Sequence, residues 1–133
     1  MDTAWLSNQG ALGQYDTSIS TIAHQANHVT FLKTTGYDFG QRSYDNQLIK
    51  PLQKVLAQPL VAGQSRLIVL HIMGSHPNPC DRLPNPPQHY VENNNSNCYI
   101  DTIRQTDTLL SQIYTTLQQN GEPFSMLILV TMA

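Results

Sequence analysis

Eight residues near the middle of the chain, Arg66 to Met73 (RLIVLHIM), form an almost unbroken apolar run. Such a run is typical of a strand in a parallel sheet with helices on both faces, because neither face of that strand meets water. Other short β-prone segments alternate with segments of helical periodicity along the chain. Since helical crossovers join parallel strands, the sequence predicts an α/β fold whose mostly parallel sheet is covered by helices on both faces.

This alternation predicts each element by residue range. We expect strands at Ala4–Ser7, Val29–Leu32, Arg66–Met73 and Phe124–Val130. We expect helices from Asp16 or Thr17 to about Ala26, from a Ser43 cap to near Pro59, and from about Tyr99 to Gln119. A turn is expected at Gly10–Gly13 and a loop at Thr34–Arg42. Apolar stripes mark the first two helices: Ile19, Ile22, Ala23 and Ala26, then Leu48, Ile49, Leu52, Val55 and Leu56.

Size and charge exclude several classes of protein. The 133 residues carry a formal net charge of −2, and only 12% of them are charged. This length allows one domain at most, and the weak charge provides no patch for nucleic acid. The start, MDTAWLSNQG, lacks the regions of a signal peptide, and no run approaches the roughly 20 apolar residues of a membrane span. Expressed alone, the chain is expected to stay in the cytoplasm.

The residues directly after the apolar strand are the first candidates for a site. Ligands of parallel sheets bind where strands end, and this strand runs into Gly74, Ser75 and His76. Gly74 allows a sharp turn, while Ser75 and His76 can present a hydroxyl and an imidazole at the sheet edge. The alternative is structural: His71 is then a hydrogen-bonded core histidine and His76 an ordinary loop residue.

Two cysteines, Cys80 and Cys98, flank a loop rich in proline and asparagine. They fit either a disulfide or two free thiols, and the disulfide is favoured because the loop has few aliphatic residues to order it. A bridge across this loop would contribute about 3 kcal/mol of stability. A zinc cluster of His76, Cys80, His89 and Cys98 is an alternative, although structural zinc sites usually present their ligands in tighter pairs.

Longer segments carry a resemblance to a known family. The stretch LIVLHIMGSH, preceded by SYDNQLIKPLQKVLAQP and followed by CYIDTIRQTDTLL, resembles the periplasmic domain of bacterial phosphoethanolamine transferases. These enzymes belong to the sulfatase and alkaline-phosphatase-like superfamily. WLSNQGALGQYDTSISTIAHQA is similar to an earlier segment of the same domain, so the resemblance covers nearly the whole chain. Ile100 departs from the family pattern, which commonly has aspartate there.

The resemblance implies an enzyme anchored in the inner membrane by an N-terminal domain, with a periplasmic catalytic domain that binds zinc. A threonine nucleophile takes phosphoethanolamine from phosphatidylethanolamine and passes it to lipid A, lipopolysaccharide core or a periplasmic glucan. Zinc activates such a nucleophile and stabilises charge on the phosphoryl group. Of the family's functional residues only a histidine maps here, onto His76. We therefore expect His76 and the adjacent Ser75 to bind substrate, and His76 to be a possible ligand of a second metal.

The same resemblance implies that important residues fall outside this sequence. The glutamate ligand and the nucleophilic threonine would precede Met1, and the Asp-His ligand pair would replace the last residues. We therefore expect an internal fragment of the catalytic domain that has no catalytic residue of its own, binds no zinc, and is inactive as a transferase. A sulfatase-like or phosphatase-like hydrolase is an alternative. Another is a non-catalytic α/β module that binds a partner or an anion through the loop from His71 to His76.

The last seven residues, LILVTMA, suggest why the Asp-His pair is missing. They can be encoded as CTT ATT TTA GTG ACC ATG GC. Read from the third base, this sequence gives Tyr-Phe-Ser-Asp-His-Gly, which is the motif that the family places after its long helix. The hypothesis is a one-nucleotide shift in the gene or in its sequencing, and the DNA sequence tests it.

Overall fold

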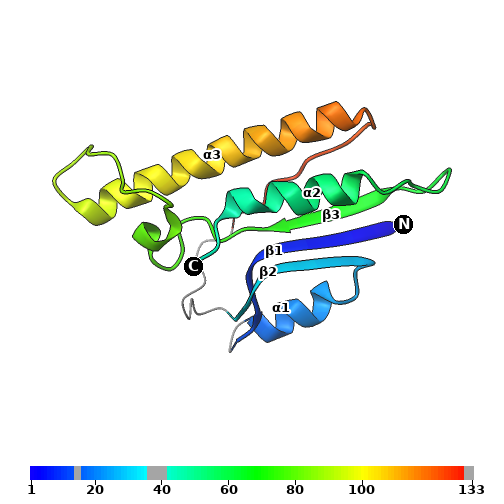
Figure 1. The fold of residues 1–133 in the computed structure, drawn as a ribbon, viewed down its shortest axis with the longest axis horizontal. Coiled ribbons are helices and arrows are strands. Elements are labelled where there is room, and N and C mark those ends of the chain that lie inside the picture. Colours follow the sequence, from blue (N-terminus) through cyan, green and yellow to red (C-terminus); the bar gives the residue numbers. More distant parts are fainter. Residues whose placement is uncertain (14–15, 36–41, 131–133) are drawn as a thin grey trace.

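The computed structural model describes residues 1–13, 16–35 and 42–130. In this part of the chain three strands form one sheet in the order β2-β1-β3, and both neighbours of β1 run parallel to it. The strands are β1 (Asp2–Leu12), β2 (His28–Thr35) and β3 (Arg66–His71). The prediction of an α/β fold with a parallel sheet is confirmed (Figure 1).

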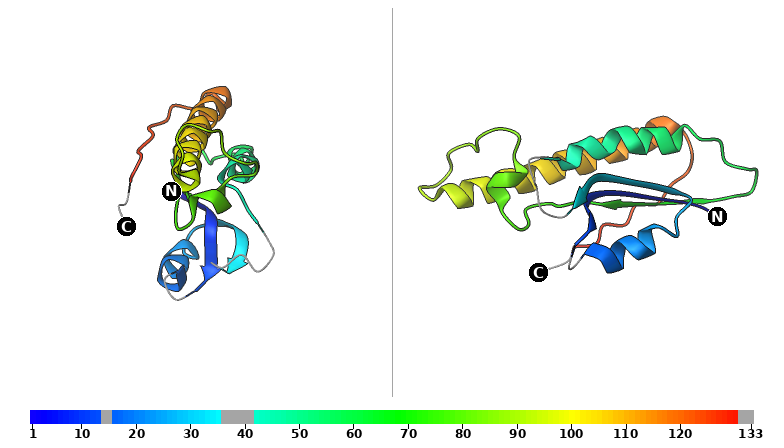
Figure 2. Two further views of the ribbon diagram at one scale, coloured as in Figure 1. Left: turned by 90° about the vertical axis from the view of Figure 1, so that its left-hand side faces the viewer. Right: turned by 60° about the horizontal axis from the view of Figure 1, so that its bottom comes forward.

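Helices lie on both sides of this sheet, as the two views of Figure 2 show together with Figure 1. Helix α1 is on one side, and α2 and α3 are on the other. The helices are α1 (Asp16–Ala23), α2 (Ile49–Leu56) and α3 (Asn94–Asn120). Two 3-10 helices, η1 (Asp45–Leu48) and η2 (Pro79–Arg82), precede α2 and follow β3 respectively.

The central strand β1 is longer than predicted. It pairs with β3 from Asp2 to Ser7, but with β2 as far as Leu12, after a register shift between Ser7 and Gly10. The turn predicted at Gly10–Gly13 is therefore wrong for residues 10 to 12. They belong to β1, because pairing with β2 keeps the backbone extended there. Beyond Ser7, β1 and β3 diverge.

The main core lies between the sheet and the helices α2 and α3. Its fully or almost fully buried members come from β1, η1, α2 and α3: Ala4, Leu6, Leu48, Leu52, Val55, Leu109 and Ile113. The partly buried side chains of Ile49 and Leu56 pack against this cluster. The predicted stripe of the second helix is therefore confirmed. Burying each leucine contributes about 1.5–3 kcal/mol relative to leaving it exposed.

The prediction for the first helix is wrong in two respects. Helix α1 ends at Ala23 instead of Ala26, and it buries Ser20 and Ala23 while Ile22 is 65% exposed. Small side chains let the helix lie close to the sheet, and this orientation turns Ile22 outwards. Near the start of the helix, the Thr17 hydroxyl donates to the Gly13 carbonyl at 2.7 Å.

The second helix does not begin with a Ser43 cap. It starts as the 3-10 turn η1, in which the Tyr44 N–H donates to Gln47 Oε1 at 2.8 Å, as in a capping box. The Ser43 hydroxyl is buried without a hydrogen-bond partner. This bond, together with the one from the Gln47 N–H to the Tyr44 carbonyl at 3.0 Å, closes the first turn in place of the expected Ser43 cap.

Helix α3 begins five residues before the predicted Tyr99. Asn93 caps it, because its Oδ1 accepts from the Ser96 N–H at 3.0 Å. The helix stops at Gly121, whose φ of 80° ends helices readily because glycine has no Cβ. The asparagine-rich tract is therefore a helix start.

The predicted strand at Phe124–Val130 is wrong. This segment is extended but unpaired, and Leu127, Leu129 and Val130 are each more than 80% exposed. A strand needs a neighbour for its N–H and C=O groups, and here the segment is attached through side chains instead. The Phe124 ring meets Tyr114 edge-on at 5.5 Å, and Met126 packs against the core.

Candidate functional site

The candidate site lies at the carboxyl edge of the sheet, where β1 and β3 separate. The chain passes from β1 to β2 on one side and then from β2 across to β3 on the other side of β1, so the direction of the strand order reverses between β1 and β3. In open α/β sheets this is the place where ligands bind. The Gln9 side chain bridges the two segments where they diverge, because its Nε2 donates to the Ile72 carbonyl at 2.9 Å.

A carboxylate from another element holds the turn after β3. Asp45, at the start of η1, accepts from the Met73 N–H at 2.9 Å through Oδ1 and from the Gly74 N–H at 2.8 Å through Oδ2. The buried Asn8 of β1 also donates to Asp45 Oδ1, at 2.7 Å. Sequence reasoning missed Asp45 and Asn8, since no local pattern indicates a contact across 28 residues.

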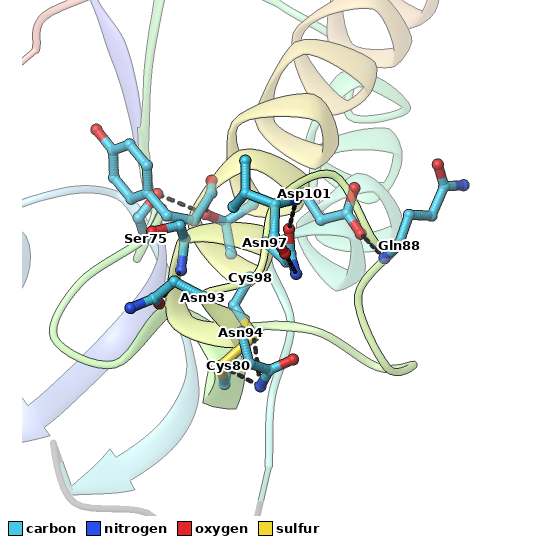
Figure 3. The surroundings of a disulfide bond; sticks show 12 residues. Ser75, Cys80, Gln88, Asn93, Asn94, Asn97, Cys98 and Asp101 are labelled. Atoms are coloured by element: carbon cyan, nitrogen blue, oxygen red, sulfur yellow. Dashed lines mark hydrogen bonds between the residues drawn. A yellow bond between two sulfur atoms is a disulfide. The ribbon is translucent and has the colours of Figure 1, made fainter.

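The turn itself has the geometry that Gly74 was expected to provide. Gly74 has a φ of 61°, which side chains with a Cβ rarely adopt, and the His76 N–H donates back to the Met73 carbonyl at 3.3 Å. Ser75 lies beside the first turns of α3 (Figure 3), and its Oγ is 2.6 Å from Thr102 Oγ1. His76 is exposed.

His71, at the end of β3, is half-buried and contacts β1. Its Nδ1 is 3.2 Å from Ser7 Oγ, and its ring meets Trp5 edge-on at 5.7 Å. Burial lowers the pKa of His71, although the charges of Asp16 and Asp45 act in the opposite direction. His71 is thus hydrogen-bonded within the sheet, as the structural alternative expected, but it is half-buried and not a member of the main core.

A cavity of about 400 Å³ adjoins the turn. Its walls come from η1, the turn after β3, the segment that follows η2, and α3. The charged residues that line it are Asp45, Arg82, Asp101 and Arg104. Gly74 and Thr102 line it too, so the turn and α3 meet at its wall.

The rim of this cavity is fixed by a polar network on α3. Asp101 accepts from the Tyr90 hydroxyl at 2.6 Å and from the Gln88 N–H at 2.7 Å. Arg104 donates to Gln88 Oε1 and to the Tyr90 hydroxyl. The hydrogen bond with Asp101 raises the pKa of Tyr90, and the same bond lowers the pKa of Asp101. These contacts hold the loop against the helix.

A disulfide fixes the other end of the same loop. Cys80 in η2 and Cys98 in α3 are joined by an S–S bond of 2.07 Å, with their Cα atoms 4.9 Å apart (Figure 3). The alternative of a zinc cluster that includes both cysteines is therefore wrong, because the two sulfurs are bonded to each other and are not thiolate ligands.

The residues that the structure describes do not fit a zinc centre. Among residues 1–13, 16–35 and 42–130, no three side chains of the types His, Cys, Asp and Glu come together as metal ligands. Within the same ranges, no helix is long and apolar enough to span a membrane.

The sequence profile of the Sulfatase family matches residues 1–131. The chain belongs to this family. It is 42% identical to phosphoethanolamine transferase OpgE of Escherichia coli K12, over 93% of the chain and 23% of OpgE. It is 27% identical to phosphoethanolamine transferase EptC of the same strain, over 56% of the chain and 12% of EptC. The expected resemblance to phosphoethanolamine transferases is thus confirmed.

A solved structure agrees with the fold. The C-terminal periplasmic domain of EptC from Escherichia coli, in complex with Zn, matches with a TM-score of 0.71 at 21% identity. The match covers 89% of the chain and 36% of that domain. The chain spans less than a quarter of the length of OpgE and about a third of the EptC domain.

Proposed function

We propose that this chain is part of the catalytic domain of a phosphoethanolamine transferase. The observation that carries the proposal is the 42% identity to OpgE, which extends over 93% of the chain and so includes the turn after β3. The donor is phosphatidylethanolamine, and the acceptor is a lipopolysaccharide, lipid A or a glucan. The complete enzyme uses zinc, in keeping with the zinc complex of the EptC domain.

Within this enzyme, the turn from Met73 to His76 forms part of the substrate pocket. His76 is exposed at the carboxyl edge of the sheet, where its imidazole can donate a hydrogen bond to a phosphoryl oxygen or serve as a ligand of a second metal. Ser75 lies next to it. The cavity beside Gly74 provides room for the rest of the substrate.

The periplasm is the compartment in which this domain works, on an enzyme anchored in the inner membrane. The Cys80–Cys98 disulfide supports this location, since disulfides persist in oxidising compartments and are rare in the bacterial cytoplasm.

The nucleophile and the principal zinc ligands belong to parts of the enzyme other than these 133 residues. The purified chain, supplied with Zn²⁺, a fluorescent phosphatidylethanolamine and a glucan or lipopolysaccharide acceptor, is therefore expected to show no turnover. A longer protein that contains this sequence is expected to add phosphoethanolamine to the acceptor, measured as a mass increase of the acceptor.

Two results would contradict the proposal. Zinc-dependent turnover by the 133-residue chain would show that it holds a complete centre. Release of the head group into water by the longer protein, without modification of any acceptor, would identify a hydrolase of the same superfamily.

A further inference from the structure

The position of one proton at the site can be deduced from two distances. Thr102 Oγ1 lies 2.7 Å from the Tyr99 carbonyl oxygen and 2.6 Å from Ser75 Oγ. A carbonyl has no proton, so the first contact is a hydrogen bond only if the Thr102 hydroxyl donates to it. That uses the single proton of Thr102. The second contact is then a hydrogen bond only if Ser75 donates to Thr102.

The proton of the Ser75 hydroxyl therefore points to Thr102 on α3 and is not available to a ligand. Thr102 is 2% exposed, so the relay from Ser75 through Thr102 to Tyr99 is a buried one. The lone pairs of Ser75 Oγ that this bond leaves free can only accept hydrogen bonds.

The backbone of the same turn is held from a second direction. The N–H groups of Met73 and Gly74 donate to the two oxygens of Asp45, and Asn8, which is 1% exposed, orients that carboxylate. Hydrogen bonds to a charged acceptor are stronger than neutral ones. The turn that presents His76 is thus fixed to η1 by its backbone and to α3 by its side chain.

We propose that Asp45 and Thr102 are positioning residues that hold the Met73–His76 turn, and that Ser75 contacts a ligand only as a hydrogen-bond acceptor. The choice of ligand rests on the proposed function. Phosphoethanolamine has an ammonium group that Ser75 can accept from, while its phosphoryl oxygens need a donor such as His76.

The positioning is tested by amide hydrogen exchange in the 133-residue chain, measured by NMR at Met73, Gly74 and His76. Ser75→Ala and Thr102→Val each remove the hydroxyl contact with little change in volume. Each is expected to speed exchange at these amides about fivefold, as the loss of one typical hydrogen bond does. The double variant is expected to exchange no faster than either single variant, because both remove the same bond.

Two further variants serve as controls for this measurement. Thr102→Ser keeps the hydroxyl and is expected to restore slow exchange. Thr115→Val removes an exposed hydroxyl on the same helix, one that bonds only the Ser111 carbonyl, and is expected to change nothing at the turn. Additive effects of Ser75→Ala and Thr102→Val, or an equal effect of Thr115→Val, would overturn the positioning role.

The role of Ser75 toward a ligand is tested by titrating the chain with O-phosphoethanolamine and with inorganic phosphate. Ser75→Ala and Thr102→Val are expected to weaken binding of inorganic phosphate equally, while Ser75→Ala weakens O-phosphoethanolamine further. Greater loss of phosphate binding in Ser75→Ala would show that Ser75 donates and would overturn the acceptor role. Binding of neither compound would overturn that role, whereas the positioning role is decided by the exchange measurement and the proposed function by turnover of the longer protein.

Discussion

At the scale of single residues, His71 shows how a polar side chain is used inside the sheet. Its ring is packed against Trp5 and bonded to Ser7, one strand away. Because burial disfavours the imidazolium, the pKa of His71 in the folded state lies below its ordinary value of 6.5. The neutral ring is therefore part of the native structure.

This shift predicts a pH dependence of stability. With a folded-state pKa below the unfolded value of 6.5, the unfolded chain binds the extra proton first, so stability is complete above about pH 6.5 and falls as the pH drops below it. Urea unfolding at pH 7.5 and pH 5.5 measures this loss. His71→Asn is expected to reduce the difference between the two pH values.

A matched control is His89→Asn, which replaces an exposed loop histidine outside the sheet. It is expected to leave the pH dependence of the wild type in place. An identical pH dependence in wild type and His71→Asn would contradict the role assigned to His71.

Residue roles at the site were only partly predictable from the sequence. The Gly74 turn was predictable, because a glycine directly after a buried strand is a local signal. The contacts of Asp45 with Met73 and of Ser75 with Thr102 were not, because they join residues 28 and 27 positions apart through side chains. Periodicity describes one element at a time and contains no information on such pairs.

At the scale of elements, α2 and α1 show when an apolar pattern predicts burial. Both have apolar residues at helical spacing. In α2 these residues meet side chains from β1 and α3, whereas α1 approaches the sheet through Ser20 and Ala23. Whether an apolar stripe is buried depends on the surface that the helix packs against. The sequence of the helix alone does not describe that surface. The same reasoning explains why Phe124–Val130, although β-prone, is unpaired.

This difference between the helices predicts different responses to mutation. Leu52 is 1% exposed, and Leu52→Ala is expected to lower the free energy of unfolding by about 2–5 kcal/mol because it leaves a cavity. Ile22→Ala is expected to lower the free energy of unfolding much less, since the Ile22 side chain is mostly exposed. Chemical denaturation measures both, with the exposed Lys54→Ala as a control on α2. Equal losses for Leu52→Ala and Ile22→Ala would contradict the core described above.

At the scale of the whole molecule, the disulfide connects η2 to the N-terminal part of α3. The loop that it closes separates the two cysteines by 18 residues and includes Leu83, Gln88 and Tyr90. The loop meets α3 through the Tyr90, Asp101 and Arg104 network. Gln88, Asp101 and Arg104 of this network line the cavity.

Removing the bridge is expected to cost about 3 kcal/mol of stability, as estimated for a closed loop of this length. The Cys80→Ser and Cys98→Ser variants, and wild type treated with a thiol reductant, are expected to show the same loss in chemical denaturation. Wild-type stability in either variant would show that the polar network alone holds the loop.

The central position of β1 has a consequence for folding. Asp2 is paired with Arg66, so β1 meets its β3 neighbour only after the chain has passed through β2 and α2. Until then Leu6, fully buried in the finished fold, lacks that neighbour. Parallel pairing between such distant segments is slow and leaves apolar surface open in the meantime. This segment is therefore expected to depend on chaperones for longer than a segment of the same length with local strand pairs.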